Sequence, residues 1–103
     1  MADKGKLDEA VEEYRTAIRL RPDDAIAHNN LGNALREQGK LDEAVEEHHT
    51  VIRLQPDFAD AHSNLGRSLH EQGKHDEAVA EYRTAIRLKP DLAFAHYNLG
   101  STP

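Results

Sequence analysis

One heptapeptide occurs three times in the chain, as Gly5-Lys6-Leu7-Asp8-Glu9-Ala10-Val11, Gly39-Lys40-Leu41-Asp42-Glu43-Ala44-Val45 and Gly73-Lys74-His75-Asp76-Glu77-Ala78-Val79. The copies begin 34 residues apart, and residues 5–38 align with residues 39–72 without a gap, with about 24 identical positions. A fixed period of this length is typical of repeats that stack, each burying its apolar face against its neighbours. The period therefore predicts an elongated array with an extended surface that can hold another chain.

Each repeat contains two predicted helices. We expect first helices at residues 25–38 and 59–72, and second helices at residues 8–20, 42–54 and 76–88. In the earliest of these, Ala10, Val11, Tyr14, Ala17 and Ile18 recur at helical spacing. Such a stripe predicts one buried face.

Turn residues mark the helix ends at equal spacing. Proline follows each second helix, at Pro22, Pro56 and Pro90, where it cannot continue the helix. An aspartate follows each proline and is suited to cap the next first helix, namely Asp23, Asp57 and Asp91. Gly39 and Gly73 close the first helices, where a left-handed backbone is expected.

A second set of glycines lies inside the first helices, at Gly32, Gly66 and Gly100. Glycine in a helix interior is less favourable than alanine by about 1 kcal/mol. Its recurrence predicts that the partner helix approaches closely at these positions.

The motif His28-x2-Leu31-Gly32-x2-Leu35, followed by Ala44-x3-His48 and Pro56, resembles the tetratricopeptide repeat (TPR) signature, with His in place of its tryptophan. The resemblance implies an all-α fold, a right-handed α-solenoid of antiparallel helix hairpins with about five helices. The first helices would line a concave groove. Residues 1–103 would then form a single array, with a half repeat at 5–24, full repeats at 25–58 and 59–92, and the start of a further repeat at 93–103.

Asparagine recurs at one register position of the first helices, at Asn30, Asn64 and Asn98. An amide donates and accepts hydrogen bonds, so a ladder of amides can pair with a peptide backbone whatever its side chains. A similar ladder lines the tetratricopeptide superhelix of O-linked N-acetylglucosamine transferase. The predicted partner is therefore a protein or an extended peptide, although a solvated face or hydrogen bonding between repeats would give the same pattern.

The neighbouring positions of the predicted groove also include Ile26, Asp60, Phe94 and Tyr97, and six of the neighbouring positions are predicted to contact the peptide. They are Asn29, Asn33, Arg36, Ser63, Arg67 and His70. Some TPR domains hold a C-terminal carboxylate in a clamp, and only Asn33 and Asn64 match that pattern here. We therefore do not expect a carboxylate clamp.

Seven histidines raise the question of a metal site. His28, His62 and His96 lie one repeat apart, roughly 10 Å by helix packing distances, which is too far to share an ion. His70 and His75 flank a turn, within possible reach of each other. We expect no natural metal site and no cofactor.

The sequence argues against catalysis and against nucleic acid. It has no cysteine, no glycine-rich phosphate loop and no His-Glu-x-x-His motif, so no catalytic residue is expected and the protein is not expected to be an enzyme. A net charge of −6 disfavours nucleic acid and anionic membranes. The sequence does not fix a compartment, and without a signal-like or membrane-spanning segment a cytoplasmic location is the expectation.

The first and last predicted helices each lack the helix that would complete their repeat. Their apolar faces would be left with one neighbour too few, at Leu7, Val11, Tyr14, Ile18, His96 and Leu99. Head-to-tail stacking or dimerisation through these helices is the alternative function, a structural module that self-associates and has no specific ligand.

Overall fold

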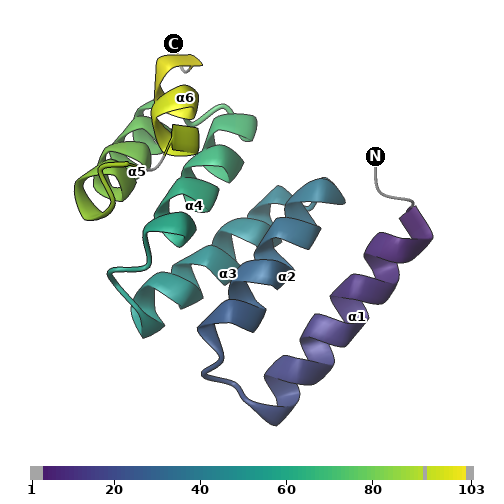
Figure 1. The fold of residues 1–103 in the computed structure, drawn as a ribbon. Coiled ribbons are helices and arrows are strands. Elements are labelled where there is room, and N and C mark those ends of the chain that lie inside the picture. The colour runs from purple at the N-terminus through teal and green to yellow at the C-terminus, as the bar shows by residue number, and fades with distance from the viewer. Residues whose placement is uncertain (1–3, 92, 102–103) are drawn as a thin grey trace.

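The computed structural model describes residues 4–91 and 93–101. These residues form six α-helices and no strand, namely α1 (Lys4–Leu20), α2 (Ala25–Glu37), α3 (Leu41–Leu54), α4 (Ala59–Glu71), α5 (His75–Leu88) and α6 (Ala93–Ser101) (Figure 1). The expected all-α fold is confirmed. Four of the predicted ranges match α2 to α5 to within one residue at each end, whereas α1 begins four residues before the predicted range of 8–20. The sixth helix arises because the start of the further repeat is itself helical. None of the described helices combines the length and the apolar character that crossing a membrane requires.

The helices stack in chain order, and successive helices run antiparallel (Figure 1). Each helix packs on the next, and α2 also contacts α4. The contact between α2 and α4 places the first helices of two repeats side by side, and these two helices carry most of the predicted site.

The core consists of small clusters between neighbouring helices. Val11 of α1 packs with Leu31 and Leu35 of α2, while Leu65 of α4 packs with Tyr82 of α5. Each helix thus buries its apolar stripe on the next one, as stacked repeats require.

The turns between α2 and α3 and between α4 and α5 have the predicted left-handed glycines. Gly39 has φ +82° and Gly73 has φ +84°. Beyond each glycine the chain folds back on the helix, because Lys40 N donates to Leu35 O at 2.9 Å and Lys74 N donates to Leu69 O at 2.8 Å. These bonds satisfy carbonyls at the helix ends and fix the hairpin geometry.

The glycines inside the first helices receive rings from the second helices. A Cβ atom at Gly32 would lie 2.5 Å from His48 Cε1, and one at Gly66 would lie 2.6 Å from Tyr82 Cε1. Close approach is therefore confirmed at both positions, and the approaching group is an aromatic side chain. At Gly100 no described atom lies within 4 Å of such a Cβ, and no second helix follows α6 among the described residues, so the prediction is not tested there.

The predicted helix caps are wrong by one residue. The N-cap of α2 is Asp24, whose carboxylate accepts from Ala27 N at 3.1 Å, whereas Asp23 lies in the preceding turn. The corresponding residue of α4 is Phe58, which makes no side-chain cap, so Asp57 does not cap either. The reason is geometric, since the cap must directly precede the first helical residue. The N-cap position of α6, next to Asp91, lies outside the described residues.

Candidate functional site

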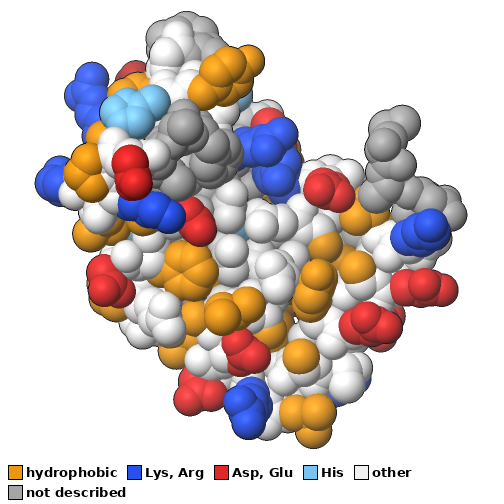
Figure 2. All heavy atoms as spheres, viewed as in Figure 1, with side chains coloured by type: hydrophobic (Ala, Val, Ile, Leu, Met, Phe, Trp, Pro, Cys, Tyr) orange, Lys and Arg blue, Asp and Glu red, His pale blue; other side chains and the backbone are white. Residues whose placement is uncertain are grey.

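The predicted groove residues come from α2, α4 and α6. Figure 2 views the side on which α2 and α4 lie in front, where white surface, made of backbone and uncharged polar side chains, adjoins hydrophobic side chains, with a Lys or Arg group at one end. Asn30, Asn64 and Asn98 are all half-buried. A cavity of about 590 Å³ lies elsewhere, lined by Lys40, Asp42 and other residues of the hairpin turns.

The asparagines of α2 and α4 are linked by a hydrogen bond that the predicted ladder does not contain. Asn64 Nδ2 donates to Asn29 Oδ1 at 3.3 Å, across the α2–α4 contact. One donor of Asn64 is thus used between repeats, which is the alternative that the sequence left open. An amide has two N–H groups and a carbonyl oxygen, so Asn64 keeps further hydrogen-bonding capacity beside Asn30.

Arg36 is the most confined charged group of this face. Its side chain is 10% exposed, and its nearest carboxylate is Glu71, with Nη1 3.8 Å from Oε1. The Nε atom is buried and has no hydrogen-bond partner among the residues that the structure describes. Burial lowers the pKa of the guanidinium, and the charge of Arg67 lowers it further. Glu71 and Glu37 act in the opposite direction, so this end of the face holds two guanidiniums together with two carboxylates.

Other predicted groove residues have different surroundings. Ser63 is fully buried and its hydroxyl has no hydrogen-bond partner within the described chain, so its expected contact with a peptide is wrong. Asn33 is half-buried with an unpartnered side-chain oxygen, and His70 contacts His75.

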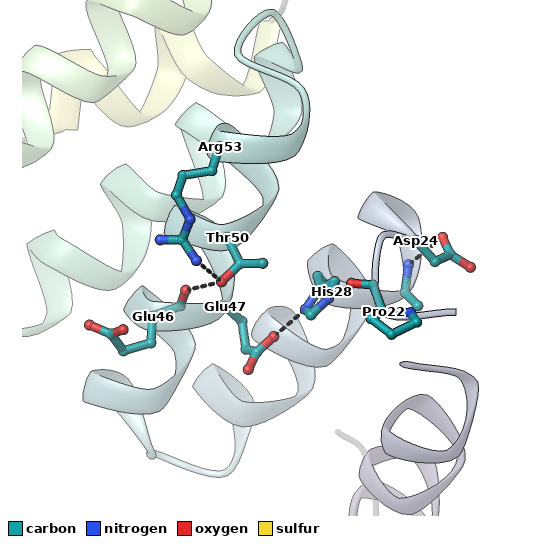
Figure 3. A network of polar contacts seen from close by, with 8 residues as sticks. Pro22, Asp24, His28, Glu46, Glu47, Thr50 and Arg53 are labelled. Carbon is teal, nitrogen blue, oxygen red and sulfur yellow. Dashed lines mark hydrogen bonds and ion pairs between the residues drawn. The ribbon is translucent and has the colours of Figure 1, made fainter. Parts of the chain in front are cut away.

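His28 and His62 are both buried, and each has two polar partners. The Nδ1 atom of His28 lies 2.7 Å from Glu47 Oε1, and its Nε2 atom lies 2.8 Å from Pro22 O (Figure 3). His62 repeats the arrangement with Glu81 and Pro56 at 2.8 and 2.9 Å. Each histidine ties a first helix to its second helix and to the loop before it.

The sequence reasoning missed the two glutamates. The available signal was their fixed distance, since Glu47 and Glu81 each lie 19 residues after the histidine that they contact. His48 is the other unexpected group, fully buried with both ring nitrogens unpartnered among the described residues.

The predicted association surface is partly occupied within the chain. Val11 is 6% exposed, so it is not available to a partner, because α2 covers it. Tyr14 and Ile18 pack at the edge of the same cluster, and Leu99 packs against the cluster of Leu65 and Tyr82. The remaining two residues of this set are Leu7, which is half-buried, and His96, which is exposed.

Antiparallel helix pairs of equal length, joined through left-handed glycines, define a helical-repeat protein. The family model of the TPR repeat matches residues 2–35, 32–73 and 66–102. The chain therefore belongs to the tetratricopeptide repeat family.

Solved TPR structures resemble the chain over nearly its whole length. YrrB, described as a TPR protein with an unusual peptide-binding site, is 26% identical with a TM-score of 0.87, over 91% of this chain and 48% of YrrB. MamA is 28% identical with a TM-score of 0.86, over 91% of this chain and 55% of MamA. The first TPR domain of Spaghetti (RPAP3), bound to the HSP90 peptide SRMEEVD, is 24% identical with a TM-score of 0.89, over 94% of this chain and 77% of the Spaghetti chain.

The chain spans about half the length of YrrB and of MamA. No curated protein matches the sequence.

Proposed function

We propose that the chain is a protein-interaction module, not an enzyme, which binds an extended peptide along the face of α2 and α4. The observation that carries the proposal is the half-buried pair Asn30 and Asn64 beside the incompletely paired guanidinium of Arg36. Membership in the TPR family and the likeness to YrrB, which has a peptide-binding site, support it.

The two parts of this face have different chemistry. Asn30 and the remaining capacity of Asn64 suit the N–H and C=O groups of a peptide backbone. Arg36 and Arg67 favour a carboxylate, because charge-assisted hydrogen bonds to a guanidinium are among the strongest that a peptide side chain can make. The peptide class that fits best is an extended segment with an acidic residue at one end.

The proposal predicts that a double Asn30→Ala, Asn64→Ala variant loses peptide binding but stays folded. The probe is a pool of random peptides of about ten residues, selected on the wild-type chain and then measured by calorimetry. Losing two or more hydrogen bonds should weaken binding by about tenfold or more.

Asn29→Ala is the comparison variant, because it removes the same 3.3 Å bond between α2 and α4 and leaves the amide of Asn64 in place. Asn29 is itself a predicted groove residue, so a loss smaller than that of the double variant is expected. If Asn29→Ala weakens binding as much as the double variant, the amides act between the repeats and do not contact peptide. Selection of peptides without an acidic residue would contradict the role given to Arg36 and Arg67.

Self-association is the second candidate, and exposed apolar side chains near the two ends of the stack favour it. Leu20 at the end of α1 is 79% exposed and Tyr97 of α6 is 75% exposed. Light scattering over about a hundredfold concentration range should then give a mass that rises with concentration. Tyr97→Glu should hold the mass at that of a monomer, and a constant wild-type mass would refute this candidate.

A further inference from the structure

Two histidine rings meet across the turn between α4 and α5. His70 lies in the last turn of α4 and His75 is the first residue of α5. Their Nδ1 atoms are 2.9 Å apart, and the ring centroids are 4.7 Å apart at an interplanar angle of 62°. The turn that joins them is fixed by the left-handed Gly73 and by the bond from Lys74 N to Leu69 O.

The fold does not need this pair. The turn between α2 and α3 has the same backbone, with Gly39 at φ +82°, and it carries Arg36 and Leu41 at the equivalent positions. The N-terminal copy of the heptapeptide has Leu7 where α5 begins with His75. The turn between α4 and α5 therefore brings two imidazole nitrogens together, and the equivalent turn between α2 and α3 does not.

We propose that His70 and His75 form a binding site for a divalent transition-metal ion, with Cu²⁺ or Ni²⁺ preferred. Two imidazole nitrogens bound to one ion at about 2.0–2.1 Å lie about 2.9 Å apart when the angle at the metal is near 90°. This is the cis arrangement of tetragonal Cu²⁺ and Ni²⁺, whereas a tetrahedral ion would hold the nitrogens about 3.4 Å apart. The 2.9 Å separation of the Nδ1 atoms equals the separation in a cis chelate, and the rings must turn out of the hydrogen bond so that both lone pairs point at the ion.

Binding requires a change of tautomer and no net loss of protons. In the hydrogen bond, one Nδ1 carries the hydrogen and the other accepts it. For both Nδ1 lone pairs to reach the ion, that hydrogen moves through solvent to Nε2 of the same ring. Both rings then bind in the neutral form, which is the form that coordinates metal.

The site is open. Among the described residues, no group of three or more His, Cys, Asp or Glu side chains is placed to hold an ion, so water completes the coordination. Both rings are half-buried, so solvent can reach them, and the exposed carboxylate of Asp76 follows His75 directly in the chain. We therefore expect an exchangeable site, which joins the end of α4 to the start of α5 when it is occupied.

The test is titration of the untagged chain with Cu²⁺, followed by calorimetry and electron paramagnetic resonance. The wild type should bind one ion tightly enough to show two nitrogen ligands in the spectrum. His75→Leu and His70→Arg should each weaken this binding by about tenfold or more, since one remaining imidazole is a poor site. Both variants should stay folded, because Leu41 and Arg36 stand at these positions in the equivalent turn.

His49→Gln is the matched control, because His49 is exposed on α3 and is not part of the pair. It should leave the affinity and the spectrum unchanged. The proposal is overturned if Cu²⁺ binds His75→Leu as tightly as the wild type, or if the tightly bound ion is lost in His49→Gln.

Discussion

Acidification from about pH 7 to about pH 4 is expected to lower the free energy of unfolding by about 3 kcal/mol through His48 alone. The side chain of His48 is fully buried in α3. Burial lowers its pKa from 6.5 to about 4, and the charges of Arg36 and His49 contribute in the same direction. The buried ring is therefore neutral in the folded protein at neutral pH.

The sign follows from where protons bind. Between pH 6.5 and about pH 4 the unfolded chain protonates His48 and the folded chain does not. The unfolded state thus binds more protons, so the free energy of unfolding falls as the pH falls through this window. Above pH 6.5 His48 is neutral in both the folded and the unfolded state, so it no longer lowers the free energy of unfolding.

His48→Tyr isolates the effect from the other titrating groups. Tyr82 fills the same position one repeat later and packs on Gly66 as His48 packs on Gly32, so the variant should fold. At about pH 7 it should be more stable by about 1 kcal/mol, because two unpartnered ring nitrogens are removed. The advantage should grow toward about pH 4, as measured by urea unfolding of both proteins at several pH values. An advantage that stays constant with pH would contradict the assignment.

The helices and hairpins could be predicted from the sequence because their signals are local. Gly39 and Gly73 have the left-handed backbone that was predicted for the turns between helices. The apolar stripe of α1 packs against α2, as its helical spacing predicted. The cap failed by one residue because the sequence offers adjacent aspartates, Asp23 and Asp24, and only the exact helix start decides between them. Once α2 and α3 were predicted, the 34-residue period also predicted the positions of α4 and α5.

The candidate site was predicted less completely, because register shows which residues share a face but not which atoms meet. Asn64 was expected to contact a peptide, and its observed partner is Asn29, one position from the expected ladder. Ser63 was expected at the surface of the groove, but its side chain is fully buried. The contact of His28 with Glu47 depends on how two helices pack, which no local signal contains.

Gly66→Ala is expected to lower the free energy of unfolding by about 2 kcal/mol. The new Cβ would lie 2.6 Å from Cε1 and 2.8 Å from Cδ1 of Tyr82, whose ring is 1% exposed and enclosed by the core. The ring cannot withdraw without disturbing Leu65 and Leu69, which share its cluster. Overpacking of this kind is unfavourable by about 3 kcal/mol, and the gain in helix propensity offsets about 1 kcal/mol of it.

Gly100→Ala is the matched control, because it is the same change at the same register of α6, where no described atom lies within 4 Å of the new Cβ. It should be neutral or slightly stabilising by thermal unfolding, and equal losses in the two variants would refute the steric explanation.

In a second comparison, the expected effect of Gly66→Ala on stability changes sign. In a Tyr82→Leu background the ring is gone, so adding Gly66→Ala should no longer destabilise and should recover part of the helix-propensity gain of about 1 kcal/mol. If Gly66→Ala is still unfavourable there, the glycine is required for something other than the ring of Tyr82, and the same doubt would extend to Gly32 beneath His48.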